Sequence, residues 1–305
     1  MSRFFEKIYL PILDALSSLS WKNIYRLSSA LNFIIFGLVG YRKKVIFQNL
    51  RNSFPEKSDE EIQTIAGQYY LHLTDLICET LKYRTCPAQD VIERIEGDIS
   101  LVDRLYRENK NVMFLMGHRG NWEAANLFSS LRFSHECLVV YRPLNSPGFD
   151  QWFLRLRTRF GARLIPMDDI AAELRKPRTR PYVVVLANDQ SPQPDSAYWT
   201  TFLNQDTGFF RGAEILARRN DLTVLYADFS RIEAKRGFYH VEISLVTDAC
   251  KSLGKNEILE KQVRMLETDI NAQPFNWLWS HRRWKHRRPA LITSDSRRSA
   301  PPSFD

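Results

Sequence analysis

The chain has 305 residues, of which 44% are hydrophobic and 26% are charged. This length suffices for one large domain or two small ones, and the composition excludes a disordered chain. Lys and Arg number 43 against 35 Asp and Glu, and the excess is concentrated near the C-terminus. Residues 275–298 hold one acid, Asp295, and seven cations: Arg282, Arg283, Lys285, Arg287, Arg288, Arg297 and Arg298. Such a segment predicts an anionic partner, either phospholipid headgroups, a phosphorylated substrate, an acidic protein or nucleic acid.

The first 85 residues are expected to be helical. Within them, residues 27–41 form a run of fifteen residues without a charge, which is shorter than the roughly 20 apolar residues of a membrane-crossing helix. Cations flank this run on both sides, namely Lys22, Arg26, Arg42, Lys43 and Lys44. The pattern predicts a helix near 22–41 that lies in, or dips into, an anionic membrane face. A buried core helix is the alternative.

The rest of the chain predicts an α/β fold. Ser58 and Glu61 form a capping box that opens a helix extending through Lys82. From about residue 111, amphipathic stretches separate short apolar runs at 112–116, 137–141, 162–166, 182–187 and 222–229. This alternation predicts a mostly parallel central sheet flanked by helices, and residues 239–245 alternate as in an edge strand. We expect a helical region over 1–85, an α/β domain over 86–290 and a disordered tail over 291–305.

The cysteines bear on cofactors and on the cellular setting. Cys78, Cys86, Cys137 and Cys250 have neither metal-ligand spacing nor the density of a disulfide scaffold. They fit a reducing cytoplasmic setting, and the N-terminus lacks the small-residue cleavage site of a secretory signal. No metal or other cofactor is predicted.

The segment Gly117-His118-Arg119-Gly120-Asn121-Trp122-Glu123 directly follows the strand predicted at 112–116. In an unbroken helix, five residues advance about 500°, which would point His118 and Glu123 apart. Gly117 and Gly120 allow a strand–turn–helix that folds these two side chains back together. His118 then lies at the carboxyl end of a parallel strand, where open α/β sheets bind ligands. Glu123 is expected to accept the proton of one imidazole nitrogen; a histidine that merely caps the helix is the alternative.

The residues around His118 also indicate a reaction class. The sequence has no G-x-S-x-G elbow and no cysteine in a cationic turn. A histidine base without a protein nucleophile indicates direct transfer, in which the hydroxyl of the substrate is activated. One alternative is a metal-dependent phosphoesterase, with His118, Glu123, Asp189 and Asp228 as ligands. Another is a non-enzymatic module that binds membrane or nucleic acid.

GHRGNWE (117–123) resembles the H-x4-D/E motif of the glycerolipid acyltransferases. Residues 5–290 are similar to the bacterial lipid A late acyltransferases, which add secondary acyl chains. Beyond the motif, the resemblance lies in RKKVIFQNLRNSFP (42–55), Tyr141-Arg142-Pro143, LRTRFGARLIP (156–166), ANDQSPQ (187–193), FLNQDTGFFRGAEILARR (202–219) and WLWSHRRWKHRRP (277–289). The chain departs from the family at Arg119, where an aromatic or small residue is usual, and at Gly208, where proline is frequent. Arg119 is expected to alter the choice of acceptor.

The resemblance implies an acyltransferase that moves a fatty acyl chain from an acyl carrier protein thioester to a hydroxyl of a lipid A precursor. His118 would be the general base and Glu123 would steady the imidazolium, with no covalent acyl-enzyme. Backbone N–H groups near Gly120 and Asn121 would stabilise the thioester oxyanion. The implied partners are the carrier protein, an anionic lipid acceptor and the membrane surface, but not nucleic acid. The implied location is the cytoplasmic face of the bacterial inner membrane, and the alternative acceptors are an ornithine or glycine lipid or a lysophospholipid.

Six further residues are expected to bind substrate. Arg142 follows a strand, and the resemblance implies that it contacts a substrate phosphate, which suits the bidentate guanidinium. Arg157 lies in a helix among other arginines. Asp189 and Gln190 follow the strand at 182–187 and are expected to shape the site opposite His118.

The last two lie near the C-terminus. Arg211, with Thr207 and Gly208, is expected in a loop before the helix 212–220, whose N-terminus could hold an anion. Arg283 belongs to the Trp-rich basic segment 277–286. Against a bilayer, the indole of residues 281–285 is expected at headgroup depth and the cations on lipid phosphates, with nucleic-acid binding as the alternative.

Overall fold

The computed structural model describes residues 3–289, so the tail expected at 291–305 lies outside the described residues. Its main sheet has seven strands in the order β1-β9-β8-β2-β5-β3-β4. All neighbouring pairs are parallel except β8 and β9. The strands are β1 (Ile95–Glu96), β2 (Val112–Met116), β3 (Glu136–Tyr141), β4 (Arg163–Pro166), β5 (Tyr182–Ala187), β8 (Thr223–Arg231) and β9 (Tyr239–Thr247). The predicted α/β fold with a mostly parallel sheet is confirmed.

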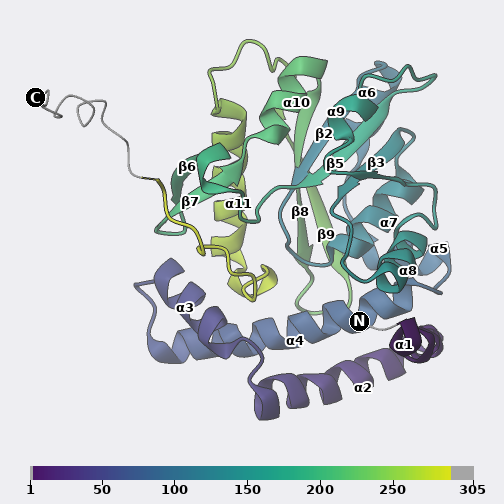
Figure 1. Cartoon of the computed structure of the whole chain (residues 1–305), viewed down its shortest axis with the longest axis vertical. Coiled ribbons are helices and arrows are strands. Elements are labelled where there is room, and N and C mark those ends of the chain that lie inside the picture. Colours follow the sequence, from purple (N-terminus) through teal and green to yellow (C-terminus); the bar gives the residue numbers. More distant parts are fainter. Residues whose placement is uncertain (1–2, 290–305) are drawn as a thin grey trace, which may run out of the picture.

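Helices cover both faces of this sheet (Figure 1). The five residues of β2 are all buried, and their side chains alternate between two hydrophobic clusters. The cluster around Phe114 includes α5 (Ala88–Arg94), α6 (Ser100–Arg107), α7 (Trp122–Arg132) and α8 (Pro147–Arg157). The cluster around Met113 includes α9 (Ile170–Glu173), α10 (Gly212–Asn220) and α11 (Glu257–Ala272). A strand buried on both faces explains the continuous apolar run in its sequence.

One hairpin differs from the expectation. Residues 207–208, predicted as loop, belong to an antiparallel pair formed by β6 (Ala197–Phe202) and β7 (Gln205–Phe210) after the short turn η2 (Pro194–Ser196). Leu203 and Asn204 join the two strands with positive φ angles of 49° and 61°, as a two-residue hairpin turn requires. The inward side chains of Phe202 and Phe209 are fully buried. Burial of these aromatic rings holds the hairpin against the main domain.

The N-terminal helices lie across one end of the sheet. They are α1 (Arg3–Ser17), α2 (Trp21–Asn32), the π-helical turn η1 (Phe33–Val39), α3 (Lys43–Ser53) and α4 (Asp59–Tyr83). Figure 1 shows α4 next to the sheet and α2 outside it. The predicted capping box is present, since the Ser58 side chain accepts from Glu61 N–H and the Glu61 carboxylate accepts from Ser58 N–H. Residues of α4 belong to both hydrophobic clusters, and the domain boundary at residue 85 stays a prediction.

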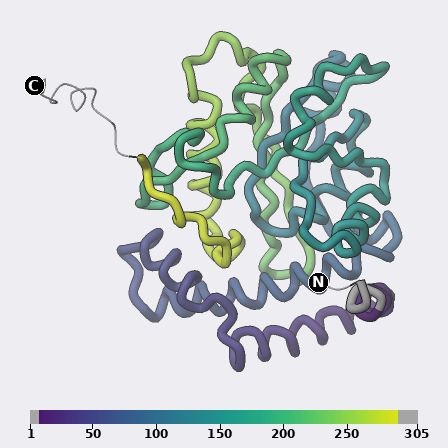
Figure 2. Tube along the Cα trace, viewed as in Figure 1, coloured from purple at the N-terminus to yellow at the C-terminus, as the bar shows by residue number. Residues whose placement is uncertain are grey.

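The segment after α11 passes through η3 (Pro274–Asn276) and crosses to lie beside α3 (Figure 2). Asn49 Nδ2 donates to Trp279 O over 2.9 Å and to His281 O over 3.0 Å. The membrane contact expected of residues 281–285, which include the partly exposed Trp284, stays a prediction. Trp277 and Trp279, in contrast, are 2% and 0% exposed and cannot reach lipid headgroups. Their rings contact each other edge to face and pack on Phe202 and Phe54, which removes them from the surface.

Candidate active site

His118 and Asp189 leave two neighbouring strands at the same edge of the sheet. Met116 of β2 lies opposite Ala187 of β5, and each of the two site residues follows its strand end by two positions. His118 Nδ1 lies 2.5 Å from Asp189 Oδ1, and the His118 backbone N–H donates to Oδ2 over 2.7 Å. The Asp189 side chain is 2% exposed and the imidazole 16% exposed. The site therefore pairs a buried carboxylate with an imidazole that remains open to a ligand.

Two neighbours hold the Asp189 carboxylate in place. The His118 backbone N–H is one of them, and the adjacent Gly117 leaves room for the carboxylate, since a Cβ there would lie 3.2 Å from Asp189 Oδ2. Trp277 Nε1 donates to Oδ2 over 2.7 Å. Oδ2 thus accepts hydrogen bonds from a backbone amide and an indole, while Oδ1 contacts Nδ1 of the imidazole. Sequence reasoning misses Trp277, because composition alone does not distinguish a buried indole donor from an interfacial tryptophan.

The two groups adjust each other's pKa. Burial alone would lower the pKa of His118, but the charge of Asp189 and its hydrogen bond outweigh burial and raise it above the usual value. Burial alone would raise the pKa of Asp189, but the imidazole and three hydrogen bonds hold it well below the usual value. Because Asp189 accepts at Nδ1, the neutral ring carries its proton there and Nε2 bears the lone pair. Nε2 is then the atom that can act as a base.

The surroundings of Nε2 are polar on one side and aromatic on the other. Gln190 Nε2 lies 3.3 Å from His118 Nε2. The Trp122 ring meets the imidazole edge to face, with centroids 5.1 Å apart. A ligand hydroxyl that reaches Nε2 therefore meets the Gln190 amide there.

Glu123 does not accept from the imidazole, in contrast to the expectation. Its carboxylate forms a two-pronged ion pair with Arg157 of α8, with Nε–Oε2 at 2.8 Å and Nη2–Oε1 at 2.5 Å. Helix α7 begins at Trp122, and the start of this helix directs the side chain of Glu123 toward α8 rather than toward β5. Glu123 still lies close enough for its charge to help raise the pKa of His118. The structure thus brings Glu123 and Arg157 together beside the His118–Asp189 pair.

The turn between β2 and α7 depends on Gly120 and Asn121. Gly120 has a φ of 54°, and a Cβ there would lie 2.1 Å from Phe229 O. Its N–H donates to Asn276 O over 3.0 Å, so this N–H is not available to an oxyanion. The Asn121 side chain caps α7, accepting from Ala124 N–H over 3.0 Å. The first hydrogen bond within α7 runs from Ala125 N–H to Asn121 O. The backbone N–H groups of Trp122 and Glu123 precede it and therefore have no partner within the helix.

Arg119, expected to influence the acceptor, is 2% exposed and turned into the protein. Its Nε donates to Asp228 Oδ1 over 2.6 Å and its Nη1 to Asp269 O over 2.6 Å. The buried carboxylate next to it is the physical reason for an arginine at this position. The expected influence of Arg119 on the acceptor stays a prediction, and its burial means that any such influence is indirect. Within residues 3–289, no three His, Cys, Asp or Glu side chains form a group that could hold a metal ion.

The remaining predicted site residues are dispersed. Arg142 is exposed and directly follows β3. Arg211 lies at the start of α10 and lines a pocket with Glu214, Arg218 and Lys255 rather than with His118. Arg283 is 3% exposed; its Nη2 donates to Gly208 O over 2.6 Å and its guanidinium lies over the Phe209 ring. Burial lowers the pKa of Arg283 to about 10.

A partly exposed imidazole lies against a buried carboxylate at the carboxyl edge of a mostly parallel sheet, which is where α/β folds bind their ligands. A family model identifies the class of enzyme more closely. The sequence model described as bacterial lipid A biosynthesis acyltransferase matches residues 2–286, and the chain belongs to this family. No curated protein matches the chain. The protein is thus an acyltransferase of lipid A biosynthesis, which excludes the phosphoesterase and binding-module alternatives.

Proposed function

We propose that the protein transfers a fatty acyl chain from an acyl carrier protein thioester to a hydroxyl of a lipid A precursor, with His118 as general base. The observation that carries this proposal is the His118–Asp189 pair, which leaves Nε2 as the basic atom. The acceptor O–H gives its proton to Nε2 and its oxygen attacks the thioester carbonyl. The C–S bond then breaks, and the departing thiolate takes the proton from the imidazolium.

Electrostatics around His118 support this sequence of steps. Asp189 stabilises the imidazolium that forms, as the buried aspartate of a catalytic triad does. Glu123 places a second carboxylate near the imidazolium, and the charge of its partner Arg157 opposes that effect. Negative charge on the thioester oxygen can be stabilised by the N–H groups of the first turn of α7, where the helix dipole is positive. We assign the exposed Arg142 to an anionic group of the substrates and Gln190 to the acceptor hydroxyl. Arg283 is buried against Gly208 and Phe209, and Arg211 lines a separate pocket, so neither is assigned to the substrates.

Direct transfer without an acyl-enzyme is supported by the state of the cysteines. All four are buried. Burial raises the pKa of the Cys78 and Cys137 thiols to about 12, and a thiol at neutral pH is a poor nucleophile. A thiolate attack on the thioester is therefore disfavoured in this protein.

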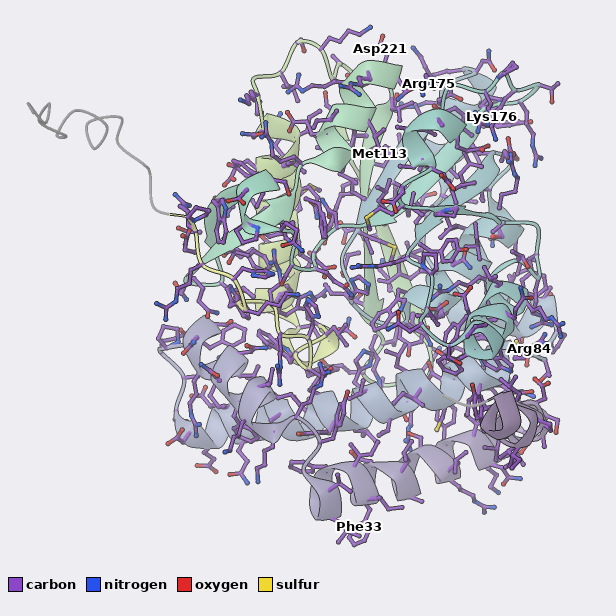
Figure 3. The ribbon with its side chains drawn as sticks, viewed as in Figure 1. Phe33, Arg84, Met113, Arg175, Lys176 and Asp221 are labelled. Carbon is purple, nitrogen blue, oxygen red and sulfur yellow. The ribbon has the colours of Figure 1, made fainter. Side chains whose placement is uncertain are left out.

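We further propose that η1 and its flanks seat the protein on the cytoplasmic face of the inner membrane. No single helix within residues 3–289 is long and apolar enough to cross a membrane. The segments Trp21–Val39 and Lys43–Ser53 satisfy length and composition together, but bend by 90° between them. Leu38 and Val39 are 70% and 68% exposed, and Phe33 projects from the outer edge of the molecule (Figure 3). An exposed apolar bend between cationic flanks fits an interfacial anchor.

Replacing Leu38 and Val39 together with aspartate is expected to lower binding to vesicles of phosphatidylethanolamine and phosphatidylglycerol by at least about tenfold. Burial of such side chains contributes about 1.5–3 kcal/mol each, and a charge reverses this gain. Sedimentation with the vesicles measures the bound fraction. Ile215→Asp is the matched control, since Ile215 is an exposed apolar residue on α10. Unchanged binding of the double variant would place the anchor elsewhere.

The proposed reaction is tested with purified protein, acyl carrier protein thioester and a lipid A precursor in mixed micelles. Mass spectrometry is expected to show the acceptor heavier by one acyl chain and the carrier protein returned to its free thiol. Parallel reactions use an ornithine lipid or a lysophospholipid as acceptor, and a coenzyme A thioester as donor. If acyl transfer occurs only with one of these alternative acceptors or with the coenzyme A donor, the proposed acceptor or donor is wrong. A protein that becomes acylated in the absence of acceptor would contradict direct transfer.

A further inference from the structure

Glu79 of α4 is a fully buried carboxylate outside the His118–Asp189 pair, with 0% exposure. It accepts hydrogen bonds from Tyr25 Oη at 3.1 Å, Asn121 Nδ2 at 2.9 Å and Tyr239 Oη at 2.6 Å. These are neutral donors from α2, from the turn between β2 and α7, and from β9. Burial, together with the nearby charge of Asp75, raises the pKa of Glu79. Burying a carboxylate among neutral donors is costly, which points to a use beyond packing.

The bond to Asn121 fixes which way the Asn121 amide faces. With Nδ2 held by Glu79, Oδ1 is directed to Ala124 N–H, where it caps α7. The amide then cannot rotate without breaking both contacts. The cap sets where α7 begins, and with it the first-turn N–H groups and the side chain of Glu123.

The Glu79 carboxylate also bonds to Tyr239 of β9, against which the turn between β2 and α7 packs. Tyr239 donates to Glu79, and a Cβ at Gly120 would lie 3.3 Å from the Tyr239 ring and 2.1 Å from Phe229 O. The turn is therefore confined by β8 and β9 on one side and by the Asn121 cap on the other. Glu79 is bonded to both sides.

We propose that Glu79 is a positioning residue that acts through Asn121 to hold the first turn of α7 in its catalytic position beside His118. This inference rests on the proposed function, because the position of the turn matters through the transfer reaction. Displacement of catalytic groups by about 1 Å can reduce turnover by about 100-fold.

Asp75 lies one helical turn before Glu79, is equally buried, and has different partners. Its carboxylate pairs with Arg231 at 2.9 Å and Arg236 at 2.5 Å and accepts from Ser28 at 2.6 Å. These contacts join α4 to α2 and to the β8–β9 hairpin. Asp75 therefore has the burial and helix of Glu79, but it binds two arginines and a serine and not the turn between β2 and α7. It is the matched control.

The test measures kcat and KM for acyl transfer, together with thermal unfolding, in wild type and five variants. Glu79→Ala is expected to lower kcat by about 100-fold with KM changed less than about threefold. Glu79→Gln is expected to stay within about threefold of wild type. Its amide oxygen can take the place of Oε2, which accepts from both Asn121 and Tyr239, and its amide nitrogen can donate to Tyr25 Oη in place of Oε1. Asp75→Asn is expected to lower the unfolding temperature and to leave kcat within about threefold of wild type, since only a structural ion pair is lost.

The action through Asn121 is tested by a double-mutant cycle. Asn121→Ser keeps an oxygen that can cap α7 but loses Nδ2, the atom that donates to Glu79, and the serine side chain is shorter. It is expected to lower kcat at least about tenfold. In that background Glu79→Ala is expected to lower kcat by less than a further threefold or so, because coupled residues are non-additive. Any of three results would overturn the proposal. They are a kcat of Glu79→Ala equal to that of wild type, a kcat of Glu79→Gln as low as that of Glu79→Ala, and effects of the Glu79 and Asn121 substitutions on kcat that simply multiply. If Glu79→Ala does not fold, the proposal is tested by the other two variants: it requires a kcat near wild type in Glu79→Gln and a lowered kcat in Asn121→Ser. Failure of the proposed function is distinct, because wild type would then transfer no acyl chain.

Discussion

Replacing His118 with alanine is expected to reduce kcat for acyl transfer about 10⁴-fold, the upper end of what a positioned general base contributes. The variant loses Nε2, the atom that takes the acceptor proton, while the Asp189 carboxylate keeps its bonds from the His118 backbone N–H and from Trp277. Because these contacts remain, we expect the variant to fold and to bind vesicles like wild type.

The loss is measured with the carrier-protein thioester and the lipid A precursor, by mass spectrometry of the acylated product. His240→Ala is the matched control, since His240 lies on β9 with about half of its side chain exposed. Near-normal turnover of His118→Ala would mean that another group removes the acceptor proton.

Replacing Asp189 with asparagine is expected to reduce kcat about 10³-fold with little change in KM. An asparagine amide cannot hold the proton on Nδ1 as a carboxylate does, so part of the histidine adopts the wrong tautomer. The pKa of His118 is also expected to fall, because burial, which lowers it, is no longer opposed by Asp189.

The sign of the pH effect follows from the need for a neutral imidazole. In wild type, kcat/KM rises as the pH passes upward through the raised pKa of His118. In Asp189→Asn this rise is expected at lower pH and to a much lower plateau. Asp228→Asn is the control, because Asp228 is a largely buried carboxylate of β8 that pairs with Arg119. A rise at unchanged pH in Asp189→Asn would show that Asp189 does not set the titration of the base.

The local pattern of the sequence was sufficient to predict most of the main sheet. Continuous apolar runs such as VMFLM at 112–116 occur where a strand is covered on both faces, and β2 has these bounds. The hairpin of β6 and β7 is missed, because Asp206 and Gly208 interrupt the alternation expected of a strand. Its aromatic residues are buried against other parts of the chain, which local periodicity does not reveal.

The sequence predicts which residues lie at the site, but not which of them contact each other. His118 and Asp189 both follow predicted strands, and each is expected at a carboxyl end. That they meet depends on β2 lying next to β5 in the sheet, and strand order is a property of the whole fold. The five-residue spacing suggests Glu123 as the partner, whereas the neighbouring strand supplies Asp189.

The sequence around Glu79 carries a signal of a buried polar site. Asp75 and Glu79 are four residues apart in a stretch of α4 that is otherwise largely apolar, so both fall on one face of the helix. Acids on a buried face need partners. The partners of Glu79 come from residues 25, 121 and 239, separations that only the folded chain brings together.

The most direct measurement of the central claim is nitrogen-15 NMR of the His118 side chain across pH in the wild-type protein and in Asp189→Asn. In wild type we expect a pKa above the usual value of about 6.5 and a neutral ring protonated at Nδ1. In Asp189→Asn the pKa falls and the second tautomer appears. A wild-type ring that is neutral with its proton on Nε2, or a pKa that does not respond to the loss of Asp189, would contradict the base assigned to this acyltransferase.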